Sequence, residues 1–331
     1  MFEVNSLYIK KSNIILKRVF LFLSIYLSSF YQLLSQDMNF SDPYSNKMIF
    51  SPAYSGISNC SEINLTYNKK YISDYYSVSY STYFNKYKSG IGINVHNGSQ
   101  GKGSINNFNI DLIYSYKITI NRKKIINTAI QATYFQQNIN TEELIFNNQI
   151  NPITEEITTN NSELYFNTYK DINFSVATAY FSTKYRTGII IKHIDKFFLK
   201  SNTEIITPLI RMHFGRIFNI KNTQKSKKIS ITPEIIYEFQ NNFNDISYGF
   251  QIVSNIFLTR LFIKHNIEFN TISPVITAGI YLKSIRLSYS YNLSFNKYIS
   301  YPNSSNQISM QYKFNCAKKR NSKKTIFCPN F

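Results

Sequence analysis

The stretch that decides the fold is Asn107 to Ile120, which reads NFNIDLIYSYKITI. Apolar or aromatic side chains stand at every second position from Phe108 onward, and all the positions between them except Ile113 are polar. Successive side chains of a β-strand point to opposite faces. This period of two therefore predicts a strand with one face in an apolar medium and the other against polar groups.

The same period recurs along the chain after Glu62 and predicts an all-β protein. About fourteen segments carry it, near 61–68, 73–84, 89–96, 105–120, 125–137, 171–182, 184–193, 208–219, 228–239, 246–254, 257–266, 272–281, 283–295 and 305–315. An even number of strands this long is typical of a bacterial outer-membrane barrel. A soluble β-sandwich is the alternative, but it predicts shorter strands and a more hydrophobic buried face.

We therefore expect a transmembrane antiparallel β-barrel of about 14 strands over residues 61–315. A short segment over 36–60 precedes it, and a basic, periplasmic tail over 316–331 follows it. Outer-membrane lipid should contact one face of the deciding stretch, while Asp111 faces the lumen. The expected lipid-facing side chains are Phe108, Ile110, Leu112, Tyr114 and Tyr116.

Composition excludes several other classes. The chain has 331 residues, of which 16% are aromatic and 17% charged, so it is too aromatic for a disordered protein. A mean hydropathy of −0.24 is too polar for a bundle of membrane helices. Lys and Arg outnumber Asp and Glu by 37 to 18, a net charge of +19. No zinc-finger, helix-turn-helix or RNA-binding pattern accompanies this charge, so we expect no nucleic-acid partner.

Residues 1–35 are typical of a signal peptide, with a basic region followed by an apolar core over 19–34. Cleavage after Ser35 would leave Gln36 as the first mature residue. A membrane-anchor helix is the alternative, but the apolar core is short for a span and serines interrupt it. Removal of four basic residues and Glu3 lowers the net charge from +19 to +16.

No motif in the chain predicts an active site, a metal centre or a cofactor. The histidines His96, His193, His213 and His265 lie in separate expected strands without the spacing of metal ligands. The glycine-rich stretch 98–103 departs from a phosphate-binding loop and fits a hairpin turn. The glutamate pairs 142–143 and 155–156 fit a solvated loop better than an acid/base pair.

The N-terminal segment resembles the opening of PorP/SprF proteins, outer-membrane components of the type IX secretion system and its gliding machinery. The matching residues are Asp37, Phe40, Tyr44, Asn46, Pro52 and Gly56. Further similarities follow in order at 89–104, 144–150 and 231–237, and the chain ends in a similar Cys328-Pro329-Asn330-Phe331. The chain departs from the family pattern at Met38, Lys47 and Asn148.

This resemblance implies a non-enzymatic outer-membrane protein that helps export, or holds at the surface, adhesins with a C-terminal sorting domain. Its partners would be periplasmic and outer-membrane subunits of the same machine, together with the adhesin cargo. A porin-like channel for small solutes is the alternative, and it predicts an open lumen and ion conductance.

The C-terminal region carries two further expectations. The final strand has the alternation of a barrel assembly signal, with Met310, Tyr312 and Phe314 on one face. In an exported chain we expect a disulfide between Cys316 and Cys328, which leaves Cys60 unpaired; three free thiols are the alternative. The tail would then present a basic docking element for a periplasmic partner: Lys318, Lys319, Arg320, Lys323, Lys324, Pro329 and Phe331.

Overall fold

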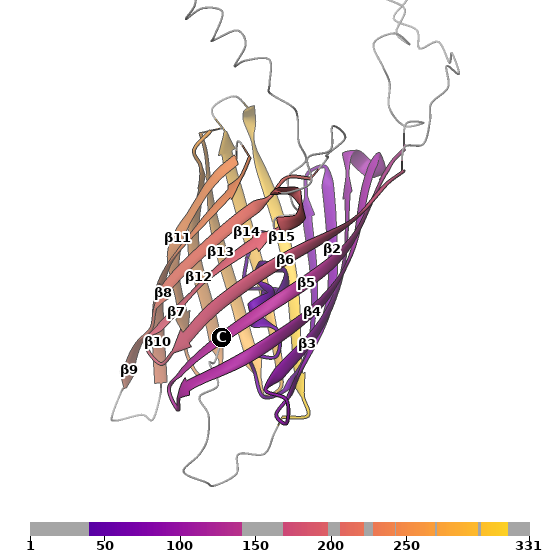
Figure 1. Ribbon diagram of the computed structural model, residues 1–331. Helices are drawn as coiled ribbons and strands as arrows, with labels where there is room; N and C mark the ends of the chain where they lie inside the picture. The colour runs from indigo at the N-terminus through magenta and orange to yellow at the C-terminus, as the bar shows by residue number, and fades with distance from the viewer. Residues whose placement is uncertain are drawn as a thin grey trace, which may run out of the picture. The chain divides into compact units, whose positions relative to one another are not determined.

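The computed structural model describes residues 40–140, 168–197, 206–221, 228–241, 243–268, 270–296 and 299–316. They form one antiparallel sheet that closes on itself (Figure 1). Its strands are β1 (Ser61–Lys70), β2 (Ser73–Phe84), β3 (Ser89–Gln100), β4 (Ile105–Asn121), β5 (Lys124–Ile139), β6 (Thr168–Ser182), β7 (Tyr185–Lys192), β8 (Leu209–Arg216), β9 (Phe218–Lys221), β10 (Lys228–Gln240), β11 (Phe243–Val253), β12 (Phe257–Asn266), β13 (Thr271–Leu282), β14 (Ile285–Asn296) and β15 (Ile299–Phe314). The short helical elements are α2 (Lys47–Phe50), η1 (Pro52–Tyr54), η2 (Gly101–Gly103) and η4 (Ile194–Phe197).

The barrel closes between its first and last strands. β1 pairs with β15 in antiparallel register, from Ser61 opposite Phe314 to Lys70 opposite Ser305. β8 and β9 both pair with β10, and only Ile217 separates them, so together they occupy one position in the barrel. The result is the closed fourteen-strand barrel that the alternating segments predict, and that prediction is confirmed. The largest boundary difference is at β15, which begins at Ile299, not near residue 305.

The alternation of side chains separates the outer surface from the lumen. On β4, Leu112 is 56% exposed on the outer face, whereas Asp111 is 3% exposed and lies in the lumen. The Asp111 carboxylate accepts hydrogen bonds of 2.7 Å from Asn94 on β3 and Thr133 on β5. On β15, Met310, Tyr312 and Phe314 alternate with buried lumen residues and so lie on the outer face, as the pattern predicts.

The two ends of the barrel differ. Because the number of strand positions is even, β1 begins and β15 finishes at the same end, which we call the termini end. Its connections are 85–88, 122–123, 183–184, 222–227, 254–256 and 283–284. The opposite end, the loop end, carries the two longest connections, 140–167 and 193–208. Most of the loop expected over 138–170 lies outside the described residues.

None of the helices formed by the described residues is long and apolar enough to span a membrane. The expected signal peptide, residues 1–35, lies outside the described part of the chain.

Candidate functional site in the barrel lumen

A segment that precedes the first strand lies inside the barrel (Figure 1). This segment, residues 40–58, is called the plug, and every residue in it except Pro43 is buried. Near the loop end, the Phe40 carbonyl oxygen accepts a 2.8 Å hydrogen bond from Lys264 Nζ on β12. Near the termini end, the Ile57 carbonyl oxygen accepts a 3.2 Å bond from Lys117 Nζ on β4. The plug therefore follows the length of the lumen.

Proline and glycine set the path of the plug. Pro52 begins η1, a position where the fixed φ of proline suits a helical turn and no backbone donor is lost. Gly56 has a φ of +61°, in the left-handed region that favours glycine. A Cβ at Gly56 would lie 2.6 Å from Gly90 Cα on β3, so glycine at these two positions lets the plug backbone lie directly against the wall.

A charged cluster in mid-lumen holds Tyr44. The Tyr44 side chain is fully buried, and its hydroxyl donates a hydrogen bond to Glu234 Oε1 on β10. Glu234 also accepts bonds from Arg186 on β7, at 3.1 Å from Nε and 2.5 Å from Nη2. The Arg186 guanidinium lies 4.7 Å from the centre of the Tyr44 ring. A buried carboxylate needs such partners, because its desolvation costs several kcal/mol.

Arginines from three other strands also bind the plug: Arg211 on β8, Arg260 on β12 and Arg286 on β14. Arg260 forms a buried ion pair with Asp42. The other two donate to backbone carbonyl oxygens of the plug, at 2.6 Å for Arg211 and at 3.3 and 3.4 Å for Arg286. These bonds satisfy carbonyl groups that no secondary structure pairs.

Uncharged side chains of the wall satisfy further carbonyl groups. Asn127 Nδ2 on β5 lies 2.7 Å from the Ala53 carbonyl oxygen. The Ser115 hydroxyl on β4 donates a 2.8 Å bond to the Ser55 carbonyl oxygen. The plug is thus bound on several sides by strands that are far apart in the sequence.

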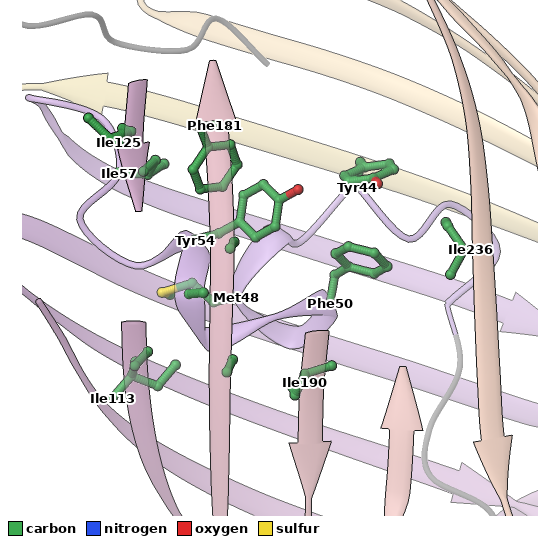
Figure 2. Packing of buried hydrophobic residues seen from close by; sticks show 14 of the residues in the cluster. Tyr44, Met48, Phe50, Tyr54, Ile57, Ile113, Ile125, Phe181, Ile190 and Ile236 are labelled. Carbon is green, nitrogen blue, oxygen red and sulfur yellow. The ribbon is translucent and has the colours of Figure 1, made fainter. Parts of the chain in front are cut away.

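Apolar side chains of the plug pack against apolar side chains of the wall, several of which Figure 2 shows. The Tyr54 and Phe181 rings meet edge to face with centroids 5.1 Å apart, and Tyr44 lies 4.7 Å from Phe50. The apolar wall residues include Ile113, Ile125, Phe181, Ile190 and Ile236. The lumen was expected to be polar, but these wall residues are apolar, and the plug covers them.

Burial favours the uncharged forms of three side chains in the plug, namely Tyr44, Tyr54 and Lys47. Desolvation raises the pKa of Tyr44 well above its ordinary value, and the nearby Glu234 carboxylate raises it further. Desolvation also raises the pKa of Tyr54. For Lys47, burial disfavours the ammonium form and lowers the pKa well below its usual value. The two phenols therefore remain hydrogen-bond donors at neutral pH.

Three of the histidines lie in strands, His96 on β3, His213 on β8 and His265 on β12, whereas His193 was expected in a strand but directly follows β7. His213 Nε2 lies 3.2 Å from the Tyr54 hydroxyl, and His96 Nδ1 lies 3.6 Å from an Asp111 oxygen. Within the described ranges, no group of three or more His, Cys, Asp or Glu side chains could hold a metal ion. The site is arranged to hold a segment of its own chain.

The structure brings most of the predicted N-terminal residues together in the plug. Phe40, Tyr44, Asn46, Pro52 and Gly56 all lie there. The Asn46 amide donates a 3.2 Å bond to Ser77 on β2. Asp37, the glutamate pairs of the long loop and the basic tail residues Lys318, Lys319, Arg320, Lys323, Lys324, Pro329 and Phe331 lie outside the described residues.

The predicted pairing of Cys316 with Cys328 is wrong, and so is the unpaired Cys60. The structure joins Cys60 to Cys316, whose Cα atoms are 4.0 Å apart. The closure of the barrel explains this bond, because Ser61 on β1 pairs with Phe314 on β15, and Cys60 directly precedes Ser61 while Cys316 follows Phe314 by two residues. Cys328 lies outside the described residues.

The sequence reasoning missed the lumen side chains that bind the plug, above all Arg186, Arg211, Arg260 and Arg286. A signal was present, since arginines on the polar face of strands need acidic or carbonyl partners when they are buried. Ile113 was a second signal, because it interrupts the polar face of β4 exactly where the apolar wall lies.

A family model described as type IX secretion system membrane protein PorP/SprF matches residues 33–312. No curated protein matches the chain. Among solved structures, Omp33 of Acinetobacter baumannii is 7% identical with a TM-score of 0.46, covering 78% of this chain and 100% of that one. The KdgM porin is also 7% identical, with a TM-score of 0.34 and coverage of 76% and 99%. Because the family match spans the plug and nearly the whole barrel, the chain belongs to the PorP/SprF family and is an outer-membrane component of the type IX secretion system.

Proposed function

We propose that this barrel helps export, or holds at the cell surface, adhesins with a C-terminal sorting domain, and that it does so without catalysis. Its partners in this proposal are the adhesin and the periplasmic and outer-membrane subunits of the secretion and gliding machinery. The observation that carries the proposal is the plug, a segment with the family's N-terminal residues that lies along the lumen of a family barrel.

The plug favours this function over a diffusive channel. A porin-like role needs an open aqueous lumen, whereas here an apolar cluster and buried ion pairs occupy the space between the walls. Breaking one such buried pair costs about 3–5 kcal/mol. Several pairs together would keep the lumen closed to solutes unless a partner displaces the plug.

The termini end is suited to acidic partners. Among the described residues, its connections and adjoining strand ends carry exposed basic side chains but no exposed acidic one. The basic residues there are Lys86, Lys88, Arg122, Lys123, Lys124, Lys184, Arg216 and Lys283. Short connections of outer-membrane barrels face the periplasm. We therefore assign this end, and the tail that leaves it after Cys316, to the periplasmic side.

Two measurements on the full-length protein test the proposal. Affinity capture from native outer membranes should recover secretion-machine subunits or an adhesin. In planar bilayers, the purified barrel should conduct little. Large, steady conductance together with capture of no machine subunit or adhesin would overturn the proposal in favour of the channel.

The tail is tested separately. Truncation after Cys316 keeps the disulfide and removes only the basic tail, and Cys328→Ser leaves the tail's charge intact. We expect a normal level of barrel and reduced adhesin secretion for the truncation. Normal secretion in the truncated strain would eliminate the tail as a docking element.

A further inference from the structure

The outer face of β5 to β10 near the termini end changes from basic to apolar in two steps along the barrel axis. The register between neighbouring strands places their outward-facing side chains in rows that run around the barrel. In the row nearest the end, Lys124 pairs with Ser182 and Tyr185 pairs with Arg216. The next row holds Tyr180, Thr187 and Phe214, and the row beyond it holds Thr178, Ile189 and Met212.

The first row borders a basic cleft of about 630 Å³ between the β4–β5 and β6–β7 connections. Four cations line it, namely Arg122, Lys123, Lys124 and Lys184. All four are exposed, and none of the ion pairs among the described residues involves them. Two tyrosines, Tyr180 and Tyr185, complete the lining. The cleft is therefore an uncompensated positive site with aromatic walls.

The next two rows form an apolar groove of about 440 Å³. The small residues Thr178, Thr187 and Gly188 line part of it. The larger residues that line it include Tyr180, Ile189, Met212 and Phe214. Tyr180 lines both the cleft and the groove, so the two hollows adjoin each other at this residue.

We propose that these hollows form a binding site for one anionic phospholipid of the inner leaflet. The cleft would receive the headgroup phosphate and the groove an acyl chain. Charge complementarity argues for an anionic headgroup, because basic residues near the membrane surface attract anionic lipids. Tyrosine is enriched at the level of lipid headgroups, which fits Tyr180 and Tyr185. The short connections of this end place the site in the inner leaflet.

The test uses the purified full-length barrel in detergent, with dipalmitoyl phosphatidylglycerol as the probe. Lipid retained per barrel and the shift in Tm on lipid addition are both measured. The headgroup variant is Lys124→Gln with Lys184→Gln. Its control, Lys86→Gln with Lys88→Gln, removes the same charge from the same end outside the cleft. The groove variant is Thr178→Trp, with Thr259→Trp on the outer face of β12 as its control.

We expect the headgroup variant to bind the lipid about thirtyfold more weakly, and its control to bind within about twofold of the native barrel. Thr178→Trp should abolish the Tm shift, and Thr259→Trp should keep it. If the headgroup variant does not fold, Lys184→Gln alone should weaken binding about fivefold.

Four results would overturn the proposal. Variants and controls could bind the lipid equally well, which would show that lipid adsorbs to the barrel without a specific site. Inorganic phosphate could stabilise the barrel as well as the lipid does, which would indicate a free-phosphate site. Phosphatidylcholine could match phosphatidylglycerol, which would exclude recognition of charge. Lipopolysaccharide could displace the phospholipid, which would place the site in the outer leaflet.

Discussion

Tyr44 links the three kinds of contact that hold the plug. Its hydroxyl donates to Glu234, its ring lies near the guanidinium groups of both Arg186 and Arg260, and it packs against Phe50. Glu234 is the partner that this arrangement needs most, because it takes bonds from both Tyr44 and Arg186. Removing the Glu234 charge therefore disturbs a phenol and an arginine together.

Glu234→Gln should loosen the plug. The variant leaves Arg186 buried without its carboxylate, a change of about 3–5 kcal/mol for a buried pair. We expect frequent conductance bursts in planar bilayers, where the native barrel is quiet. Glu268→Gln, an exposed position at the loop end, should behave like the native protein. Equal quietness of both variants would show that the charge of Glu234 does not hold the plug.

Alkaline pH should also release the plug. Tyr44 and Tyr54 have raised pKa values in the buried plug, so their contribution is complete below about pH 10 and is lost as the pH rises further. Lys47 acts in the opposite direction. Because burial lowers its pKa, the stability of the buried plug increases as the pH rises toward about 10.5, the ordinary pKa of lysine. Above that pH, Tyr44 and Tyr54 are the ones of these three groups that still titrate, and conductance should increase. Tyr54→Phe should shift the increase to higher pH; an unchanged profile would contradict this account.

At the scale of the strand, two outward-facing positions on β4 test which part of the barrel lies in the lipid core. Leu112 lies near the middle of the strand and Ile120 near its termini end, both on the outer face. Leu112→Arg should cost about 2–4 kcal/mol and lower the amount of barrel in the outer membrane, whereas Ile120→Arg should cost about 0–1 kcal/mol. Similar membrane levels of both variants would mean that this face does not meet the lipid core. Asp111→Arg is a weaker control, because Asp111 accepts bonds from two neighbouring strands.

The strands were predictable because the period of two is a local property of the sequence. This period predicted the fourteen strand positions and the side chains of the outer face. Its main errors were in the strand boundaries, such as the start of β15. The plug has no such period, and its place depends on contacts with residues far along the chain, such as Glu234. The disulfide could not be predicted for the same reason, because Cys60 and Cys316 meet only after the barrel has closed.

At the scale of the molecule, the bond between Cys60 and Cys316 joins residues 256 positions apart. In the chain-entropy model a loop of this size contributes on the order of 5 kcal/mol. Cys60→Ser should therefore lower the temperature at which the barrel unfolds, as measured by heat-dependent gel mobility under non-reducing conditions. Cys328→Ser is the matched control and should leave that temperature unchanged. A fall with Cys328→Ser alone would contradict the observed pairing.

The difference between the two ends makes orientation testable as well. We expect Glu268→Cys, at the loop end, to react with a membrane-impermeant maleimide on intact cells. Lys123→Cys, at the termini end, should react only after the outer membrane has been permeabilised. The native protein serves as the control for its own cysteines. Labelling of Lys123→Cys on intact cells would invert the assigned orientation and would move the proposed lipid site to the outer leaflet.

The disulfide also determines how the barrel bears mechanical load. A partner that pulls on the chain after Cys316 would otherwise peel β15 from β1 one hydrogen bond at a time, the weakest way to separate a strand pair. With Cys316 bonded to Cys60, the pull is divided at once between the two strands of the seam and the end of the plug that precedes Cys60. The barrel can thus resist a pull on the chain after Cys316 without losing the pairing of its first and last strands.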